Sequence, residues 1–310
     1  MQRKKRLTPL LLAFCMLLCG CGGAMAPPGG ESLSRAVSED FTPYTAPPFA
    51  SSQYHEDLAE GEDDTRIDLS AVSEGYVAVS VKSDKRLKFQ VLKDGETYNY
   101  DLASDGTPSI YPLQCGNGRY TFRVMENVTE NKYAQIYITE RDVVLLDEFQ
   151  PFLRPSDYAS YSPDSACVKK AAELANGCGS ALDVVGAVYE FVCRTVRYDS
   201  GKAASVKSGY LPSPDETMQT GMGICFDYAA LAAAMLRSQG IPTKLIFGYV
   251  APDDLYHAWN MFYTEESGWV TVSFEVSAAE WTRMDLTFSA GGAPVEFVGD
   301  GSNYLDLYSY

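Results

Sequence analysis

Cys225 is the residue whose type and position in this sequence best suit nucleophilic chemistry. It follows the glycine-rich stretch Gly221–Gly223 and begins the Ala-rich run CFDYAALAAAMLRSQG, which predicts a buried helix. The start of a helix favours a thiolate, because unpaired backbone N–H groups and the positive end of the helix dipole lie there. The glycines let a substrate carbonyl come close, and the backbone N–H of Cys225 can then donate to an oxyanion. A structural cysteine packed inside the helix is the alternative.

His257 is the candidate base for this thiol. The chain has two histidines, and the other one, His55, lies in a segment with the composition of a linker. His257 begins the predicted strand HAWNMFY directly after the loop APDDLY, so its imidazole can reach across a cleft to a helix start. Its role would be to accept the proton of Cys225 and later to protonate the leaving group. A histidine on the surface or in the core is the alternative.

Asp285 is the candidate that would orient the imidazole of His257. It lies within the otherwise apolar strand WTRMDLTF, and a buried carboxylate is costly unless it is paired. A paired carboxylate holds the imidazole in the tautomer that catalysis needs. Asp199, Asp253 and Asp254 are rivals for this role. An aspartate on an edge strand that faces solvent is the alternative interpretation of Asp285.

Three motifs together resemble the transglutaminase-like superfamily. The run GICFDYAAL around Cys225, followed by LRSQGIP, is similar to the nucleophile helix of that family. HAWN, which begins at His257, and WTRMDLT, which contains Asp285, are similar to its histidine and aspartate strands. The motifs occur in family order over about residues 160–290. The resemblance implies a papain-like α+β fold with a Cys-His-Asp triad.

The sequence departs from the family pattern at the acid. Family members often carry the aspartate in the strand that follows the histidine strand, and here that strand, GWVTVSF, has Ser273 at the corresponding place. Asp285 restores the pattern farther along the chain, which indicates an inserted strand or hairpin. In relatives an upstream aromatic residue helps to form the oxyanion hole, and the resemblance assigns this role to Tyr210 in the run GYLP.

The elements that must position these residues fall into two domains. Residues 65–152 contain short runs such as LKFQVLK and YTFRVME, whose alternation predicts a small antiparallel β domain without catalytic motifs. Residues 155–290 show helical spacing first and strands afterwards, which fits the transglutaminase-like domain. The expected fold class is therefore α+β, with a small β domain before a papain-like catalytic domain. Residues 291–310 form a C-terminal tail for which the sequence predicts no element.

The N-terminus predicts export and lipid anchoring. Residues 1–20 have the pattern of a lipoprotein signal peptide, because a basic start precedes an apolar run, Leu7–Leu18, that is too short to span a bilayer. The run LCGC at positions 18–21 resembles the bacterial lipobox, which implies cleavage after Gly20 and lipid on Cys21. A plain secretory signal is the alternative. Residues 21–64 are rich in Gly, Pro, Ser and acidic residues and predict a flexible linker.

The charge and the remaining cysteines limit the partners. The formal net charge of −16 argues against nucleic acid, because a phosphate backbone binds basic surfaces. The other cysteines lack the spacing of metal ligands, although Cys167 and Cys178 could pair in an oxidising compartment. Neither a metal ion nor a cofactor is expected.

These features predict an extracytoplasmic lipoprotein, anchored to the cell membrane, that acts on amide or peptide bonds through a thioester. The expected substrates are envelope proteins or peptidoglycan peptides, and both hydrolysis and amide crosslinking stay open. The layout of the lipobox, the β domain and the catalytic domain is similar to that of lipoproteins of Firmicutes. The alternatives are a non-catalytic module that binds the envelope and retains the fold, and an acetyl transferase.

Overall fold

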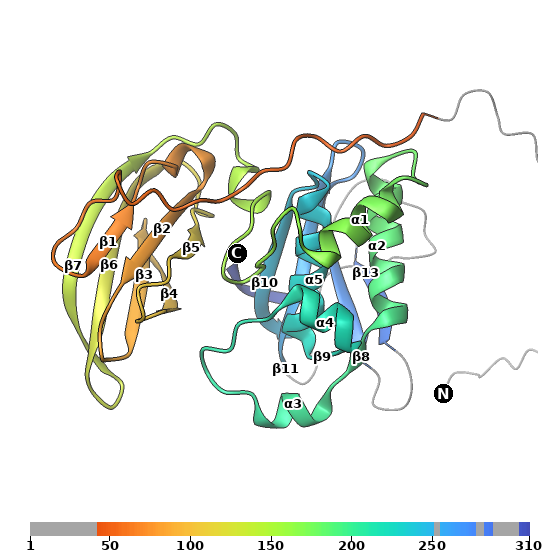
Figure 1. The fold of residues 1–310 in the computed structure, drawn as a ribbon. Helices are drawn as coiled ribbons and strands as arrows, with labels where there is room; N and C mark the ends of the chain where they lie inside the picture. The colour runs from red at the N-terminus through yellow and green to blue at the C-terminus, as the bar shows by residue number, and fades with distance from the viewer. Residues whose placement is uncertain (1–41, 251–254, 277–281, 288–303) are drawn as a thin grey trace, which may run out of the picture. The chain divides into compact units, whose positions relative to one another are not determined.

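The computed structural model describes residues 42–250, 255–276, 282–287 and 304–310 (Figure 1). Its first half is the expected antiparallel β domain, built from two sheets. The smaller sheet has the order β1-β2-β5, and the larger one the order β4-β3-β6-β7. The strands are β1 (Thr65–Asp68), β2 (Tyr76–Val81), β3 (Leu87–Lys93), β4 (Glu96–Leu102), β5 (Ser109–Pro112), β6 (Gly118–Thr129) and β7 (Lys132–Val143), with a 3-10 helix, η1 (Val72–Glu74), after β1 and another, η2 (Gln150–Phe152), after β7.

The alternation in LKFQVLK explains how β3 is used. Leu87, Phe89 and Val91 are buried, whereas the residues between them are partly exposed, as the period of two in a strand requires. The ring of Phe89 stacks on Tyr111 with centroids 4.9 Å apart and on Phe122 with centroids 6.1 Å apart. Aromatic side chains from both sheets therefore form the core of this domain.

Helices come first in the second half of the chain, as the sequence predicted. The central one is α5 (Cys225–Ser238), in which every residue after Cys225 is buried because small alanines let neighbouring elements approach on all sides. Gly240 has a φ of 74°, and Pro242 follows it, so the helix cannot continue. The other helices and the two short paired strands are α1 (Ala166–Ala175), α2 (Ala181–Thr195), β8 (Arg197–Tyr198), α3 (Ser200–Ser205), α4 (Pro214–Thr220) and β9 (Met222–Gly223).

A five-stranded antiparallel sheet follows, with the strand order β13-β12-β11-β10-β14. Helix α5 packs against β10, β11 and β12 and also contacts α1, α2 and α4. Figure 1 shows α5 lying along this sheet, with α1 and α2 beside it. A helical layer packed on an antiparallel sheet, after a separate β domain, confirms the expected α+β class. The strands are β10 (Thr243–Val250), β11 (Leu255–Thr264), β12 (Gly268–Val276), β13 (Thr282–Thr287) and β14 (Tyr304–Ser309).

The end of the chain is a strand rather than an unassigned tail. Residues Tyr304–Ser309 pair with β10, and Tyr310 is buried. The backbone groups of Tyr310 and Leu245 exchange two hydrogen bonds of 2.7 Å. The alternating run YLDLYSY is the sequence signal for this strand, but only the exposed edge of β10 gives it a partner.

Residues 42–64 also differ from the flexible linker that their composition predicted. The backbone N–H of Tyr44 donates to the carbonyl of Cys178 at 2.8 Å, and its hydroxyl donates to the carbonyl of Gln239 at 2.6 Å. Pro47 lies directly on Gly240, where a Cβ would come within 2.1 Å of the proline ring. Prolines lose little freedom on ordering, so a few anchors suffice to fix this segment. The signal peptide, the lipobox with Cys21, and residues 22–41 lie outside the described residues.

Two further findings bear on the sequence-based expectations. The described cysteines, including Cys167 and Cys178, are all free thiols, so the pair that their spacing allowed is not formed. Within the described ranges, no helix is long and apolar enough to cross a membrane.

Candidate active site

Cys225 is the first residue of α5, where the sequence placed it. The glycines before it are required for the local backbone structure, whereas the sequence suggested that they give access to a substrate carbonyl. Gly221 ends α4 with a φ of 63°, and its N–H donates to Thr217 at 3.0 Å. Gly223 packs so closely on Asp227 that a Cβ at this position would lie 2.7 Å from the Cβ of Asp227. Only glycine therefore permits this approach to the helix.

The thiol of Cys225 is half-buried, and its pKa is raised. Burial is the largest cause, and the negative charge of Asp227 adds to it. Hydrogen bonds from the backbone N–H groups of Ala258 and Phe226 act in the opposite direction. Burial therefore opposes the thiolate that the helix start was expected to favour, and a base near the thiol would assist its deprotonation.

His257 lies on β11, opposite Gly248 of β10. Its ring is nearly parallel to that of the buried Trp259, with centroids 6.3 Å apart. Ala258, whose N–H donates to the thiol of Cys225, lies between these two rings in the sequence. Cys225 and His257 line the same cavity, which has a volume of about 760 Å³. The tertiary structure thus brings the expected nucleophile and the expected base to one site.

Asn260 fixes the histidine strand to the nucleophile helix. Its side chain is fully buried, and its amide donates to the carbonyl of Ala229 on α5 at 3.1 Å and to that of Lys244 on β10 at 3.2 Å. The hydroxyl of Tyr189 on α2 donates to its carbonyl oxygen at 3.1 Å. Asn260 is part of the motif HAWN, but no local pattern indicated its three partners.

Asp285 lies on β13, opposite Ser273 of β12. Because β12 separates β13 from β11, and neighbouring strands lie about 4.8 Å apart, the backbone of Asp285 is about 10 Å from the strand of His257. The described ladder between β11 and β12 ends at the pair Asn260 and Val272, short of His257. Strand β12 therefore lies between the strands of Asp285 and His257, and an interaction between these two residues would have to cross it. The side chain of Asp285 lies outside the described part of the structure.

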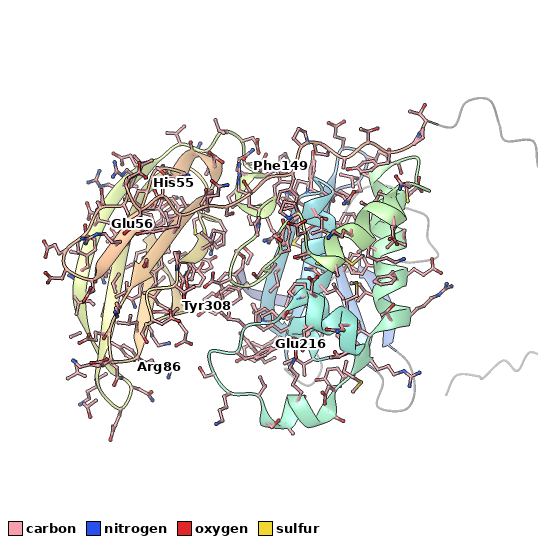
Figure 2. All side chains as sticks on the ribbon, in the orientation of Figure 1. His55, Glu56, Arg86, Phe149, Glu216 and Tyr308 are labelled. Atoms are coloured by element: carbon pink, nitrogen blue, oxygen red, sulfur yellow. The ribbon has the colours of Figure 1, made fainter. Side chains whose placement is uncertain are left out.

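The rival aspartates fall into two groups. Asp253 and Asp254 lie outside the described residues. Asp199 caps α3, because its carboxylate accepts a hydrogen bond of 2.8 Å from the backbone N–H of Lys202. The other histidine, His55, is labelled in Figure 2. One of its ring nitrogens is 3.1 Å from a carboxylate oxygen of Asp68 on β1.

Tyr210, the expected oxyanion donor, lines the cavity that contains Cys225. Its hydroxyl donates to the carboxylate of Asp227 and accepts a hydrogen bond of 2.6 Å from the ammonium of Lys202. Burial is the largest cause that raises the pKa of Tyr210 to about 12, so the phenol is neutral. The hydroxyl of Tyr210 already donates its proton to Asp227, so donation to a substrate oxyanion would require that hydrogen bond to break. The sequence missed Asp227 and Lys202, which are 25 positions apart and carry no motif as a pair.

The β domain contributes to the walls of the cavity. The second domain supplies many of the aromatic side chains, and the β domain supplies polar and charged ones together with Tyr111. A substrate that reaches Cys225 therefore meets groups from both domains, although the sequence assigned no role to the first. Examples are Tyr198, Phe247 and Tyr256 on one side and Lys88, Asn99 and Asp101 on the other. Among the described residues, no group of three or more His, Cys, Asp or Glu side chains is placed to hold a metal ion.

This fold, with a cysteine at a helix start and a histidine on the adjacent sheet, defines a transglutaminase-like domain. Residues 168–274 match the family model of the transglutaminase-like superfamily, which confirms what the sequence motifs indicated. No curated protein matches the sequence at a significant level.

Several solved structures are similar to this chain. One is a proposed cysteine protease from Cytophaga hutchinsonii, with 20% identity, a TM-score of 0.37, and coverage of 74% of this chain and 89% of that one. Another is the periplasmic domain of TgpA from Pseudomonas aeruginosa, with 15% identity, a TM-score of 0.33, and coverage of 69% and 93%. A third is red sea bream transglutaminase, with 11% identity, a TM-score of 0.28, and coverage of 64% and 48%.

Proposed function

We propose that this chain is a cysteine-type enzyme that transfers the acyl group of a carboxamide or peptide bond. The observation that carries the proposal is that Cys225 and His257 line one cavity, with the N–H of Ala258 directed at the thiol. His257 accepts the proton of Cys225, and the thiolate attacks the carbonyl carbon. The amine leaves with the proton from His257, and a thioester on Cys225 remains. Water then gives hydrolysis, and a second amine gives a new amide.

The backbone N–H of Cys225 is the first oxyanion donor in this proposal. As the first residue of α5 it has no carbonyl partner within the helix. The positive end of the helix dipole adds to the stabilisation of the negative oxygen that develops in the transition state. Asp285 is retained as the residue that orients His257, across the intervening strand β12.

Reactivity of Cys225 as a function of pH is the direct test. We expect iodoacetamide to label Cys225 faster near neutral pH than Cys193, whose pKa burial raises to about 11. His257→Ala should slow the labelling of Cys225 by at least about tenfold near pH 7, because the base is lost, and should leave the melting temperature nearly unchanged. The proposal would be wrong if Cys225 and Cys193 were labelled at equal rates, or if the pH profile of Cys225 labelling were unchanged in His257→Ala.

The turnover rates of aspartate variants test which carboxylate orients His257. On any amide substrate found by release of ammonia from envelope extracts, Asp285→Asn should lower kcat by about 10³–10⁴-fold if Asp285 sets the tautomer of His257. Asp253→Asn and Asp254→Asn are the matched controls and should have little effect. If Asp253→Asn or Asp254→Asn lowered kcat more than Asp285→Asn, the role of orienting His257 would belong to that residue instead.

The cellular setting is part of the same proposal. The lipobox supports an anchor on Cys21, and an anchored enzyme outside the cytoplasm would meet envelope proteins or peptidoglycan peptides. Cys21→Ser should move the protein from the membrane fraction to the soluble fraction, and unchanged partitioning would refute the anchor.

A non-catalytic module that binds the envelope is the second candidate. The raised pKa of the Cys225 thiol favours it, because a buried, protonated cysteine is also what a retained structural residue would show. The labelling experiment separates the two candidates, since only an enzyme needs His257 to activate the thiol.

A further inference from the structure

The start of α5 carries two groups that are negative in the reactive state. One is the thiolate of Cys225, and the other is the carboxylate of Asp227, which is fully buried two residues later. One oxygen of Asp227 accepts a hydrogen bond of 2.8 Å from the N–H of Ile224. The same helix N-terminus therefore has to stabilise both negative charges, and each charge disfavours the ionised form of the other group.

Lys202 supplies the opposing charge. Its ammonium lies 2.7 Å from the oxygen of Asp227 that Ile224 also contacts, and it is the only cation within 4.0 Å of that carboxylate in the described part of the chain. The same ammonium donates to Tyr210 at 2.6 Å and lies 4.4 Å from the centroid of its ring. The side chain of Lys202 is 30% exposed, so the ion pair lies at the edge of the core.

We propose that Lys202 is a positioning residue of this active site: it neutralises Asp227 beneath the first turn of α5, so that Cys225 shares the helix start with an ion pair instead of a bare carboxylate. The inference rests on the proposed role of Cys225 as the nucleophile. Lys202 touches neither the thiol nor a substrate in this arrangement, and it acts through Asp227. Tyr210 completes the arrangement by donating to the second oxygen of the carboxylate.

The other groups that face the thiol do not replace this cation. Burial raises the pKa of the tyrosines next to Cys225, so they are neutral near pH 7. Among the charged groups, Asp227 is the one that acts directly on the thiol, and Lys202 is paired with it; Lys88, Asp101, Asp157 and Lys207 line other parts of the cavity. The groups around the thiol are Asp227 on α5 itself, Tyr198 on β8, Tyr256 and His257 on β11, Lys202 on α3, and Tyr210 in the segment after α3.

The test measures the pH midpoint of Cys225 labelling by iodoacetamide in the full chain. Lys202→Met leaves Asp227 uncompensated, which disfavours the thiolate, so the midpoint should move upward by about one pH unit. Lys202→Arg should keep the wild-type midpoint, because it retains the cation. Lys169→Met, on the exposed face of α1, is the matched control and should change nothing.

A double variant separates charge from structure. Lys202→Met with Asp227→Asn removes both charges, and we expect its midpoint to return to within about 0.3 pH unit of the wild-type value. A purely structural role of Lys202 would leave the double variant as impaired as the single one. Tyr210→Phe keeps the ion pair and should shift the midpoint by less than Lys202→Met does. Lys202→Gln replaces Lys202→Met if the latter lowers the melting temperature.

The outcomes distinguish this inference from the proposed function. If wild-type Cys225 labels no faster than Cys193, the proposed nucleophile fails, and the role of Lys202 fails with it. If wild-type Cys225 is reactive but Lys202→Met keeps its midpoint, or the double variant stays shifted, only the inference about Lys202 is overturned.

Discussion

The two ends of α5 both bury a charge, but they satisfy it in different ways. At the first turn, Asp227 is paired with the ammonium of Lys202 beside the cavity. In the last turn, Arg237 is almost fully buried and donates to three backbone oxygens: Thr243 at 2.8 Å, Tyr310 at 2.9 Å and Arg154 at 3.0 Å. Burial lowers the pKa of Arg237 to about 10, which leaves it charged near neutral pH.

The difference shows what each buried charge is for. The oxygens that Arg237 contacts belong to three separate segments: the start of β10, the connection between the two domains, and the residue after β14. This arginine therefore holds the architecture together. The pair at the other end adjoins the proposed nucleophile and one wall of the cavity, and we infer that it adjusts reactivity. A variant at one end should change stability, and a variant at the other should change chemistry.

Loss of Arg237 should have the largest effect on stability. Arg237→Met removes the three hydrogen bonds that the buried guanidinium donates to backbone carbonyl groups, and we expect the free energy of unfolding to fall by about 3–5 kcal/mol. Urea unfolding measures this loss. Arg194→Met is the matched control, because Arg194 is exposed and, among the described residues, pairs with Glu190 one turn away, so its effect should be below about 0.5 kcal/mol.

The same variant also tests the comparison itself. In the fraction of Arg237→Met that stays folded, Cys225 should label at the wild-type rate, since Arg237 lies at the far end of the helix. A loss of labelling without a loss of stability would show that the two ends are not separate in function.

Asn260 joins the helix of Cys225 to the strand of His257. Its loss should therefore lower both the stability of the protein and the reactivity of Cys225, each by a moderate amount. Asn260→Ala removes the hydrogen bonds that hold β11 on α5, and we expect a loss of about 2 kcal/mol in the free energy of unfolding. Labelling of Cys225 should also slow by several-fold, because the strand that carries His257 loses its anchor to the helix of Cys225. Asn131→Ala, in the exposed turn after β6, is the control for both measurements. An unchanged labelling rate would make Asn260 a purely structural residue.

Tyr44 should give the smallest effect. Tyr44→Phe removes one hydrogen bond to the carbonyl of Gln239, so we expect a loss of about 1 kcal/mol by urea unfolding, with no change at Cys225. Tyr133→Phe is a suitable comparison, because the buried Tyr133 hydroxyl has no hydrogen-bond partner among the described residues. If Tyr44→Phe is neutral, then residues 42–64 are held by the packing of Pro47 on Gly240 and not by this bond.

The catalytic domain was predictable where function depends on local signals. The glycine before the helix, the Ala-rich run after Cys225 and the strand that begins at His257 are each visible within a few residues. They predicted the α+β class, the family and the element that carries each candidate. The strand YLDLYSY was missed although it alternates, because a short alternating run at a chain end has no partner until the sheet exists.

What the sequence determined by itself was the identity of the chemical groups and the elements that carry them, because helix starts and strand alternation follow from nearby residues. Only the tertiary structure decided the electrostatics of the site. Lys202 and Asp227 meet because the tertiary structure brings the side chain of Lys202 to the start of α5, and the thiol pKa rises because burial disfavours its charged form. Burial and charge pairing depend on residues distant in sequence, so no local pattern reveals them.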